Sequence, residues 1–143
     1  MRRRRIKGCK QAIIILSLLT VASCANAKNL TSKDLSSEVL SAISLASETE
    51  MFVGQIQQGR LTQEFQYGYA GYLRDEAERE AKDLRTSTPQ PAQMQAVRNC
   101  IAQLDLLARE LDLIKRTDKT RLPAIQKRVQ TIVQSLSAVK AQL

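Results

Sequence analysis

The stretch PAQMQAVRNCIAQLDLLARELDLIKR, residues 91–116, carries the most regular hydrophobic pattern in the chain. Pro91 suits the first turn of a helix, where its missing N–H breaks no hydrogen bond. Lys115 and Arg116 suit the last turn, where positive charge interacts favourably with the helix dipole. Between these ends, apolar side chains recur at gaps of three and four residues, at Met94, Val97, Cys100, Ile101, Leu104, Leu107, Ala108, Leu111 and Ile114. This spacing predicts an amphipathic α-helix that buries one face.

A similar pattern follows after a four-residue turn, TDKT at 117–120. The helix predicted here begins near Arg121 and has Pro123 in its first turn. Its apolar positions are Leu122, Ile125, Val129, Ile132, Val133, Leu136, Val139 and Leu143. Because the turn is short, we expect the two helices to pack side by side in opposite directions.

A third helix is predicted on the N-terminal side of these two. It begins near Thr31 or Ser32, where TSKD (31–34) places a capping hydroxyl before an acidic residue. It ends near Gly59, which suits the left-handed conformation that often follows a helix. Its apolar stripe, interrupted at 48–50, consists of Leu35, Val39, Ala42, Ile43, Ala46, Val53 and Ile56.

A fourth helix is predicted between these segments, from after Leu61 or Thr62 to the break at TSTPQP, residues 86–91. Its second half is rich in strong helix formers and offers i,i+4 pairs of opposite charge, such as Arg74 with Glu78. Its apolar stripe consists of Phe65, Tyr69, Tyr72, Leu73, Ala77, Ala81 and Leu84.

Four helices with one apolar face each predict an all-α fold, an antiparallel up-down-up-down four-helix bundle over residues 31–143. The alternative is a long helix, formed by fusion of the first two, with the last two packed on it as a helical hairpin. Gly59 lies where the long helix would be continuous, and therefore favours the bundle.

Residues 1–23 have the organisation of a secretory signal peptide. A basic start, MRRRRIKGCK, precedes an apolar run from Ala12 to Ala22. That run has 11 residues, whereas a helix needs about 20 apolar residues to span a bilayer. We therefore expect the segment to be cleaved rather than to stay in the membrane.

The end of this leader, Val21-Ala22-Ser23-Cys24, resembles the lipobox of bacterial lipoprotein precursors. The resemblance covers the leader alone, and it implies that Cys24 is lipidated and becomes the first residue of the mature chain. Several acyl chains would then anchor the protein stably to a membrane, with residues 24–30 as a short tether. The alanine at position 25, where an aspartate favours the inner membrane, implies an outer-membrane protein that faces the periplasm.

A second cleavage site overlaps the first. Ala25-Asn26-Ala27 matches the A-x-A pattern of ordinary signal cleavage. Cleavage after Ala27 would remove Cys24 and release a soluble periplasmic or secreted protein. The apolar run leads directly into Cys24, which favours the lipidated form.

The net charge of +8 does not indicate a nucleic-acid-binding protein, because six of the positive residues lie within the predicted leader, which has no acidic residue. From Cys24 onward, 16 Lys and Arg stand against 14 Asp and Glu, which leaves +2. A nucleic-acid-binding domain keeps its basic surface in the folded part. The chain also has no histidine, which excludes Ser-His-Asp catalysis, His-ligated haem and most zinc sites.

The three tyrosines, Tyr67, Tyr69 and Tyr72, lie in EFQYGYAGYLRDE, residues 64–76, together with two glycines. A glycine inside a helix costs roughly 1 kcal/mol relative to alanine, so we expect a compensating contact. The tyrosines fan over more than one helix face, which makes them candidates for a partner-binding patch. The alternative is close internal packing at the glycines, with the tyrosine hydroxyls reaching the surface.

Other reactive side chains are expected to be structural. Cys100 lies in an apolar stripe and is predicted to be a core residue without a disulfide partner. Carboxylates near the connection of the first two helices are not expected to bind metal, because the di-iron sites of bundles also use histidine. These carboxylates are Glu48, Glu50 and Glu64. Two carboxylate pairs are predicted to lie on solvated faces without a role in acid–base catalysis, Glu76/Glu80 and Glu110/Asp112.

These features predict a non-enzymatic lipoprotein of the cell envelope. Its bundle is expected to act as a scaffold, adaptor or inhibitor by contact with an unidentified envelope protein, without a cofactor. The alternative is a soluble secreted bundle, cleaved after Ala27, that binds a small apolar ligand between its helices. The sequence contains no nucleophile–base pair, phosphate-binding loop or metal-binding motif that would indicate an enzyme.

Overall fold

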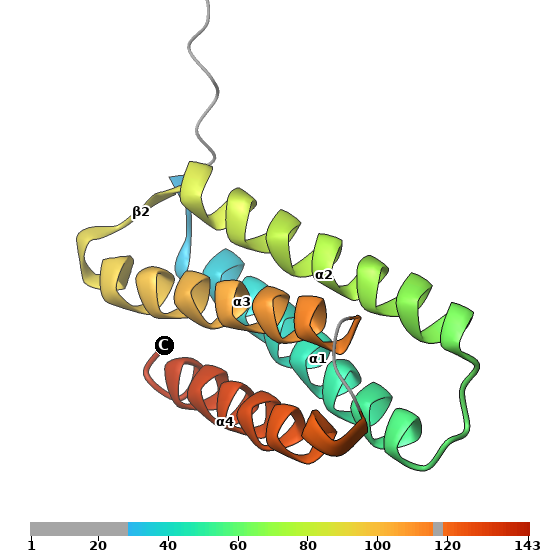
Figure 1. The fold of residues 1–143 in the computed structure, drawn as a ribbon. Helices are drawn as coiled ribbons and strands as arrows, with labels where there is room; N and C mark the ends of the chain where they lie inside the picture. The colour runs from blue at the N-terminus through green and yellow to red at the C-terminus, as the bar shows by residue number, and fades with distance from the viewer. Residues whose placement is uncertain (1–28, 116–118) are drawn as a thin grey trace, which may run out of the picture.

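A computed structural model describes residues 29–115 and 119–143, and within them it confirms an all-α fold of four packed helices (Figure 1). These are α1 (Ser32–Gln57), α2 (Gln63–Thr86), α3 (Met94–Ile114) and α4 (Leu122–Lys140). Two short 3-10 turns, Pro91–Gln93 and Lys119–Arg121, precede α3 and α4. Two short strands, β1 (Asn29–Leu30) and β2 (Thr88–Pro89), pair in parallel. The predicted helices are therefore confirmed.

Successive helices run in opposite directions, so the fold is the predicted up-down-up-down bundle (Figure 1). The most extensive contacts are those of α2 with α3 and of α1 with α4. The long-helix alternative is wrong because the chain turns between α1 and α2. Gly59 makes that turn with a φ of 68°, a left-handed conformation that favours glycine.

The first two helices begin where capping side chains accept hydrogen bonds from their first backbone N–H groups. The N–H of Asp34 donates to the hydroxyl of Thr31 at 3.2 Å, and the N–H of Thr31 donates to the Asp34 carboxylate at 3.1 Å. This reciprocal capping box fixes the start of α1. At the start of α2, the N–H of Phe65 donates to the Thr62 hydroxyl at 3.4 Å.

The core consists of one buried side of each helix. Its largest fully buried side chains are Leu35, Ile56, Leu73, Leu104, Leu107, Leu111, Ile125 and Leu136. The interruption predicted at 48–50 does not exist on this face, because Thr49 is fully buried. Its hydroxyl donates to the carbonyl of Leu45 at 2.9 Å, which satisfies the polar group inside the core.

Four residues assigned to the apolar stripes are exposed instead. Phe65 and Tyr72 lie on the flank of α2 that faces α1, because the inner line of α2 is formed by Ala70, Leu73, Ala77, Ala81 and Leu84. Met94 is the first residue of α3, and Leu143 lies beyond the end of α4, so neither is covered by a neighbouring helix.

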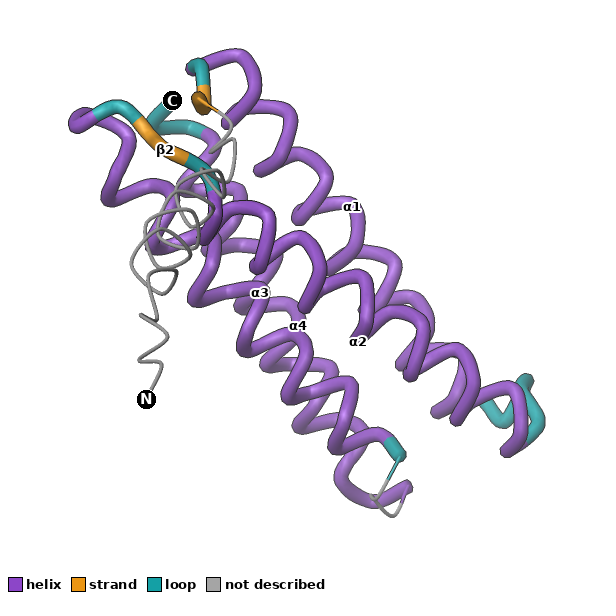
Figure 2. Tube along the Cα trace, turned by 90° about the horizontal axis from the view of Figure 1, so that it is seen from above, coloured by secondary structure: helices purple, strands orange, loops and turns teal. Residues whose placement is uncertain are grey.

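The described part of the chain begins at the end of the bundle that also holds the α2–α3 connection and the C-terminus (Figure 2). Asn29 and Leu30, the last residues of the predicted tether, form β1, and Leu30 is buried. The predicted signal peptide, the lipobox and Cys24 lie outside the described residues. No helix in the described part of the chain has the length and apolar content needed to cross a bilayer.

Candidate functional site

Four of the five aromatic side chains of the chain form one cluster between α1 and α2. Tyr69 stands at its centre, with ring centroids 5.1 Å from Phe52, 5.2 Å from Phe65 and 5.9 Å from Tyr72. These distances are typical of favourable aromatic pairs. Together with the neighbouring Met51, we call this cluster the aromatic edge.

The aromatic edge forms because the chain turns back directly after α1. The end of α1, with Met51 and Phe52, therefore lies beside the start of α2 (Figure 1). On α2, Phe65, Tyr69 and Tyr72 are spaced i, i+4 and i+7, which puts them on one helix face. That face points towards α1 rather than into the centre of the bundle.

Much of this cluster is in contact with solvent. The exposed fraction is 65% for Met51, 55% for Tyr72 and 50% for Phe65. A hollow of about 450 Å³ opens beside them, lined by Ser44, Ser47, Glu48, Met51, Phe52, Gln55, Phe65 and Tyr69. Adjacent exposed apolar side chains of this kind typically mark a contact surface.

A single carboxylate enters this hollow. The hydroxyl of Tyr69 donates a hydrogen bond to Glu48, and this bond, with burial and the nearby negative charge, raises the pKa of Tyr69 to about 12. Within the described residues, no Lys or Arg forms an ion pair with Glu48. The hollow therefore combines aromatic faces with a negative charge.

The three predicted tyrosines do not form one patch. Tyr69 and Tyr72 belong to the aromatic edge, whereas Tyr67 takes no part in its ring contacts. Two residues along a helix correspond to a rotation of roughly 200°, so Tyr67 points away from Tyr69. Its hydroxyl accepts a hydrogen bond from the Gln63 amide at 2.6 Å.

Sequence reasoning missed Met51, Phe52 and Phe65 as members of the site. Phe65 was assigned to the core, and Met51 and Phe52 follow the supposed interruption of the first stripe. The signal that would have found them is the i, i+4, i+7 spacing of the α2 aromatics opposite two bulky residues at the end of α1.

The two glycines near the tyrosines have different surroundings. A side chain added at Gly68 would meet no atom within 4 Å, so close packing does not explain this glycine. A side chain at Gly71 would lie 3.2 Å from the Lys115 ammonium at the end of α3. Only Gly71 therefore allows a close approach by another element.

The expectation of solvated carboxylate pairs is wrong for Glu110. Its carboxylate is buried and accepts two hydrogen bonds from Arg128, at 2.6 Å from Nε and 2.8 Å from Nη2. This bidentate pair joins α3 to α4. It supplies the buried Glu110 carboxylate with a positive partner.

The same expectation is wrong for Glu80, which is partly buried between α1 and α2. One carboxylate oxygen accepts a hydrogen bond from the Ser41 hydroxyl at 2.6 Å, and the other has no partner among the described residues. Burial is the largest cause of a raised Glu80 pKa, to which the charges of Glu38 and Glu76 add.

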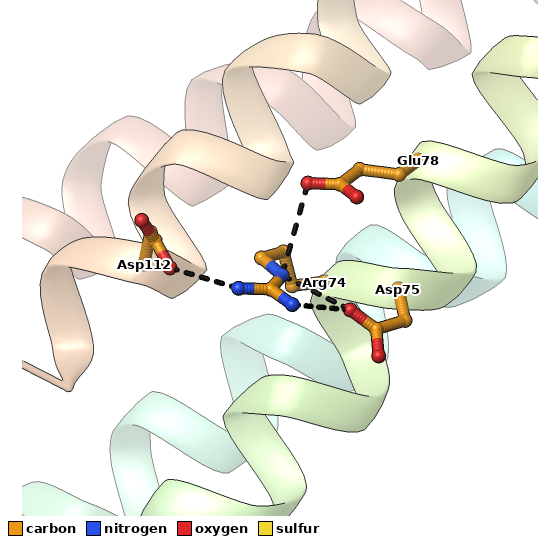
Figure 3. A network of polar contacts seen from close by, with 4 residues as sticks. All are labelled: Arg74, Asp75, Glu78 and Asp112. Atoms are coloured by element: carbon orange, nitrogen blue, oxygen red, sulfur yellow. Dashed lines mark hydrogen bonds and ion pairs between the residues drawn. The ribbon is translucent and has the colours of Figure 1, made fainter.

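Asp112, the other member of its pair, belongs to a surface network that joins α3 to α2 (Figure 3). Arg74 lies at its centre, with guanidinium nitrogens 3.3 Å from Asp112, 2.6 Å from Asp75 and 3.7 Å from Glu78. The 3.7 Å contact is the predicted i,i+4 pair. Because each of these contacts joins groups of the protein itself, and one of them joins α2 to α3, we assign the network to helix packing.

Cys100 is fully buried, as predicted. Burial is the main cause that raises the pKa of its thiol to about 12, so it is protonated at neutral pH. Within the described residues no group of Cys, Asp and Glu side chains is arranged to hold a metal ion. No protein-family model, curated protein or solved structure matches the chain.

Proposed function

We propose that the protein is an envelope lipoprotein, anchored through Cys24, whose bundle acts as a scaffold, adaptor or inhibitor by binding another envelope protein at the aromatic edge. The anchor rests on the lipobox-like sequence that ends at Cys24. The binding role rests on the aromatic edge, where exposed aromatic and methionine side chains surround a hollow. Side chains of these kinds are enriched where proteins bind each other.

The position of the aromatic edge is the observation that carries the proposal. The start of α1 lies at the same end of the bundle as β2 and the C-terminus (Figure 2), whereas Phe52 lies near the last turn of α1, towards the other end. Phe52 lies 20 residues beyond the start of α1 at Ser32, which corresponds to about 30 Å along the helix. A bundle tethered at Cys24 can therefore present the aromatic edge away from the membrane surface.

The anchor is tested by metabolic labelling with a palmitate analogue. The proposal predicts that the wild-type chain carries the label and fractionates with the outer membrane, whereas the Cys24→Ala variant carries none and leaves the membrane fraction. An unlabelled wild-type chain would contradict the anchor.

Binding at the aromatic edge is tested by photo-crosslinking in cells. A photoreactive residue in place of Tyr72 is expected to capture a protein, and one in place of Tyr67 serves as the matched control. Equal capture from the two positions, or capture from neither, would contradict a contact at the aromatic edge.

The volume of the hollow supports a second candidate, a soluble bundle cleaved after Ala27 that binds a small apolar ligand. Its volume of about 450 Å³ falls within the range of known ligand pockets, roughly 300–1,000 Å³. Organic extraction of the purified protein, followed by mass spectrometry, tests this candidate. A stoichiometric apolar compound that is lost in a Phe65→Ser variant would support it, and a clean extract would exclude it.

A further inference from the structure

The charge along the α1–α2 edge is mainly negative beyond the aromatic edge as well. The Ser41–Glu80 hydrogen bond joins α1 to α2 there, and the charges of Glu38 and Glu76 act on Glu80. Arg79 forms an ion pair with Glu76 on this side. With Glu48 in the hollow, carboxylates therefore recur along the side where α1 and α2 meet.

This combination of groups is suited to a cation on an aliphatic stem. The faces of aromatic rings attract Lys and Arg, most strongly where water is excluded. The methylene groups of these side chains pack on apolar surface while the charged end reaches a polar partner. In the hollow, Met51 and Phe65 offer the apolar surface, Tyr69 offers a ring, and Glu48 offers the carboxylate.

An uncharged or acidic occupant does not fit equally well. It would cover Glu48 without supplying a positive charge, and a carboxylate removed from water without such a partner is unfavourable. The Tyr69 hydroxyl supplies one hydrogen bond to Glu48 but no charge. The hollow thus selects for positive charge as well as for apolar area.

We infer that the aromatic edge binds a basic amphipathic segment of the partner protein, with one Lys or Arg side chain seated in the hollow between the aromatic rings and Glu48. The inference rests on the proposed function, because it names the chemistry of the partner that the aromatic edge contacts. Helices with one apolar face bind grooves in this way, through residues spaced three and four apart.

The probe is a fluorescent 14-residue peptide of Lys and Leu with helical spacing, and its control carries Glu in place of Lys. Binding to the full chain, purified as the cell processes it, is followed by fluorescence anisotropy. We expect the Lys peptide to bind at least tenfold more tightly than the Glu peptide, and more weakly as salt is added.

Two matched variants locate the charge that matters. Glu48→Gln keeps an acceptor for Tyr69 but removes the charge, and we expect it to weaken binding of the Lys peptide about fivefold. Glu50→Gln removes the same charge two residues away, where the carboxylate accepts a hydrogen bond from Gln130 of α4. We expect this control to change binding less than twofold. Any binding of the peptide to lipid or detergent is common to both variants and cancels in the comparison.

A second pair of variants locates the apolar contact. Tyr72→Ser is expected to weaken binding, and Tyr67→Ser is its control outside the aromatic edge. Circular dichroism melting curves show whether each variant is folded, so that a loss of binding is assigned to the surface.

The inference is overturned if the Lys peptide does not bind, if the Glu peptide binds as tightly, or if the two Gln variants weaken binding equally. In these cases the proposed function still stands if the photo-crosslinker at position 72 captures a protein and the one at position 67 does not. Absence of that selective capture is the outcome that removes the proposed function itself.

Discussion

The hydroxyl of Tyr69 in α2 donates a hydrogen bond to Glu48 of α1, and this bond joins the two helices at the centre of the aromatic edge. The same tyrosine contacts Phe52, Phe65 and Tyr72 through its ring. Tyr69 therefore positions the exposed aromatics as well as the carboxylate of the hollow, and its two contributions can be measured separately.

Tyr69→Phe keeps the ring contacts but removes the donor to Glu48. A hydrogen bond to a charged group is worth about 1.5–3 kcal/mol, so we expect the free energy of unfolding in urea to fall by roughly 1–2 kcal/mol. Tyr67→Phe removes an exposed hydroxyl contact with Gln63 and should cost less than about 0.5 kcal/mol. Equal losses of unfolding free energy in the two variants would show that the hydrogen bond to Glu48 adds no more stability than an exposed one.

In the folded protein, Tyr69 is expected to lose its proton at a higher pH than an ordinary tyrosine. Its pKa is raised to about 12, from an ordinary value near 10. The folded state therefore holds this proton more tightly than the unfolded state, and the stability gained from it is lost as pH rises through this range. In an absorbance titration at 295 nm, the last phase should disappear in the Tyr69→Phe variant. If the curves of the wild type and the Tyr69→Phe variant were identical above pH 11, the assignment would be contradicted.

Glu80→Gln is expected to stabilise the protein at neutral pH. The raised pKa of Glu80 means that the folded state binds a proton more readily than the unfolded state. The stability that this proton contributes is present below the ordinary carboxyl pKa and is lost as pH rises through the raised value. Gln removes the charge, and its carbonyl can keep the hydrogen bond from Ser41.

The expected gain for Glu80→Gln at pH 7 is up to about 1 kcal/mol, because burial first, and then the nearby carboxylates, disfavour the charged form of this partly exposed group. The measurement is urea unfolding of the wild type and the variant at pH 7 and at pH 3.5. The two proteins should converge at the lower pH, and a gain that is the same at both would contradict the role of ionised Glu80.

The Cys100 thiol is expected to be unreactive in the folded protein, because it is buried and its pKa is raised to about 12. Iodoacetamide at pH 8 should leave it unmodified within hours and should alkylate it rapidly in 6 M guanidinium. Intact-mass spectrometry gives both results. Rapid alkylation without denaturant would show that α3 opens readily or that Cys100 lies near the surface.

The helices could be predicted from local signals. Thr31, Gly59, Pro91 before α3 and Pro123 in the first turn of α4 mark helix ends without reference to distant residues. Each signal acts through the backbone of its own segment. The spacing of apolar residues between two such signals then predicts which face of the helix is buried.

The flanks of the helices could not be predicted in the same way. Phe65 and Leu73 both fit the apolar stripe of α2, but the packing of α2 on α3 and α1 decides which is covered. Glu110 likewise reads as a surface residue until Arg128 of α4 is placed opposite it. All three tyrosines were predicted as candidates, but only Tyr69 and Tyr72 lie in the aromatic edge, and their partners on α1 depend on how the two helices align.

The most direct test of a contact at the aromatic edge is the protection of position 51 in the native envelope. A Met51→Cys variant places a reactive thiol at a side chain that is 65% exposed, and Met94→Cys, at 42%, is the control near the opposite end of the bundle. We predict that maleimide labels Met51→Cys rapidly in the purified protein and at least fivefold more slowly in intact envelopes, with no such difference for Met94→Cys. Equal labelling of Met51→Cys in both preparations would contradict the claim that a partner covers the aromatic edge.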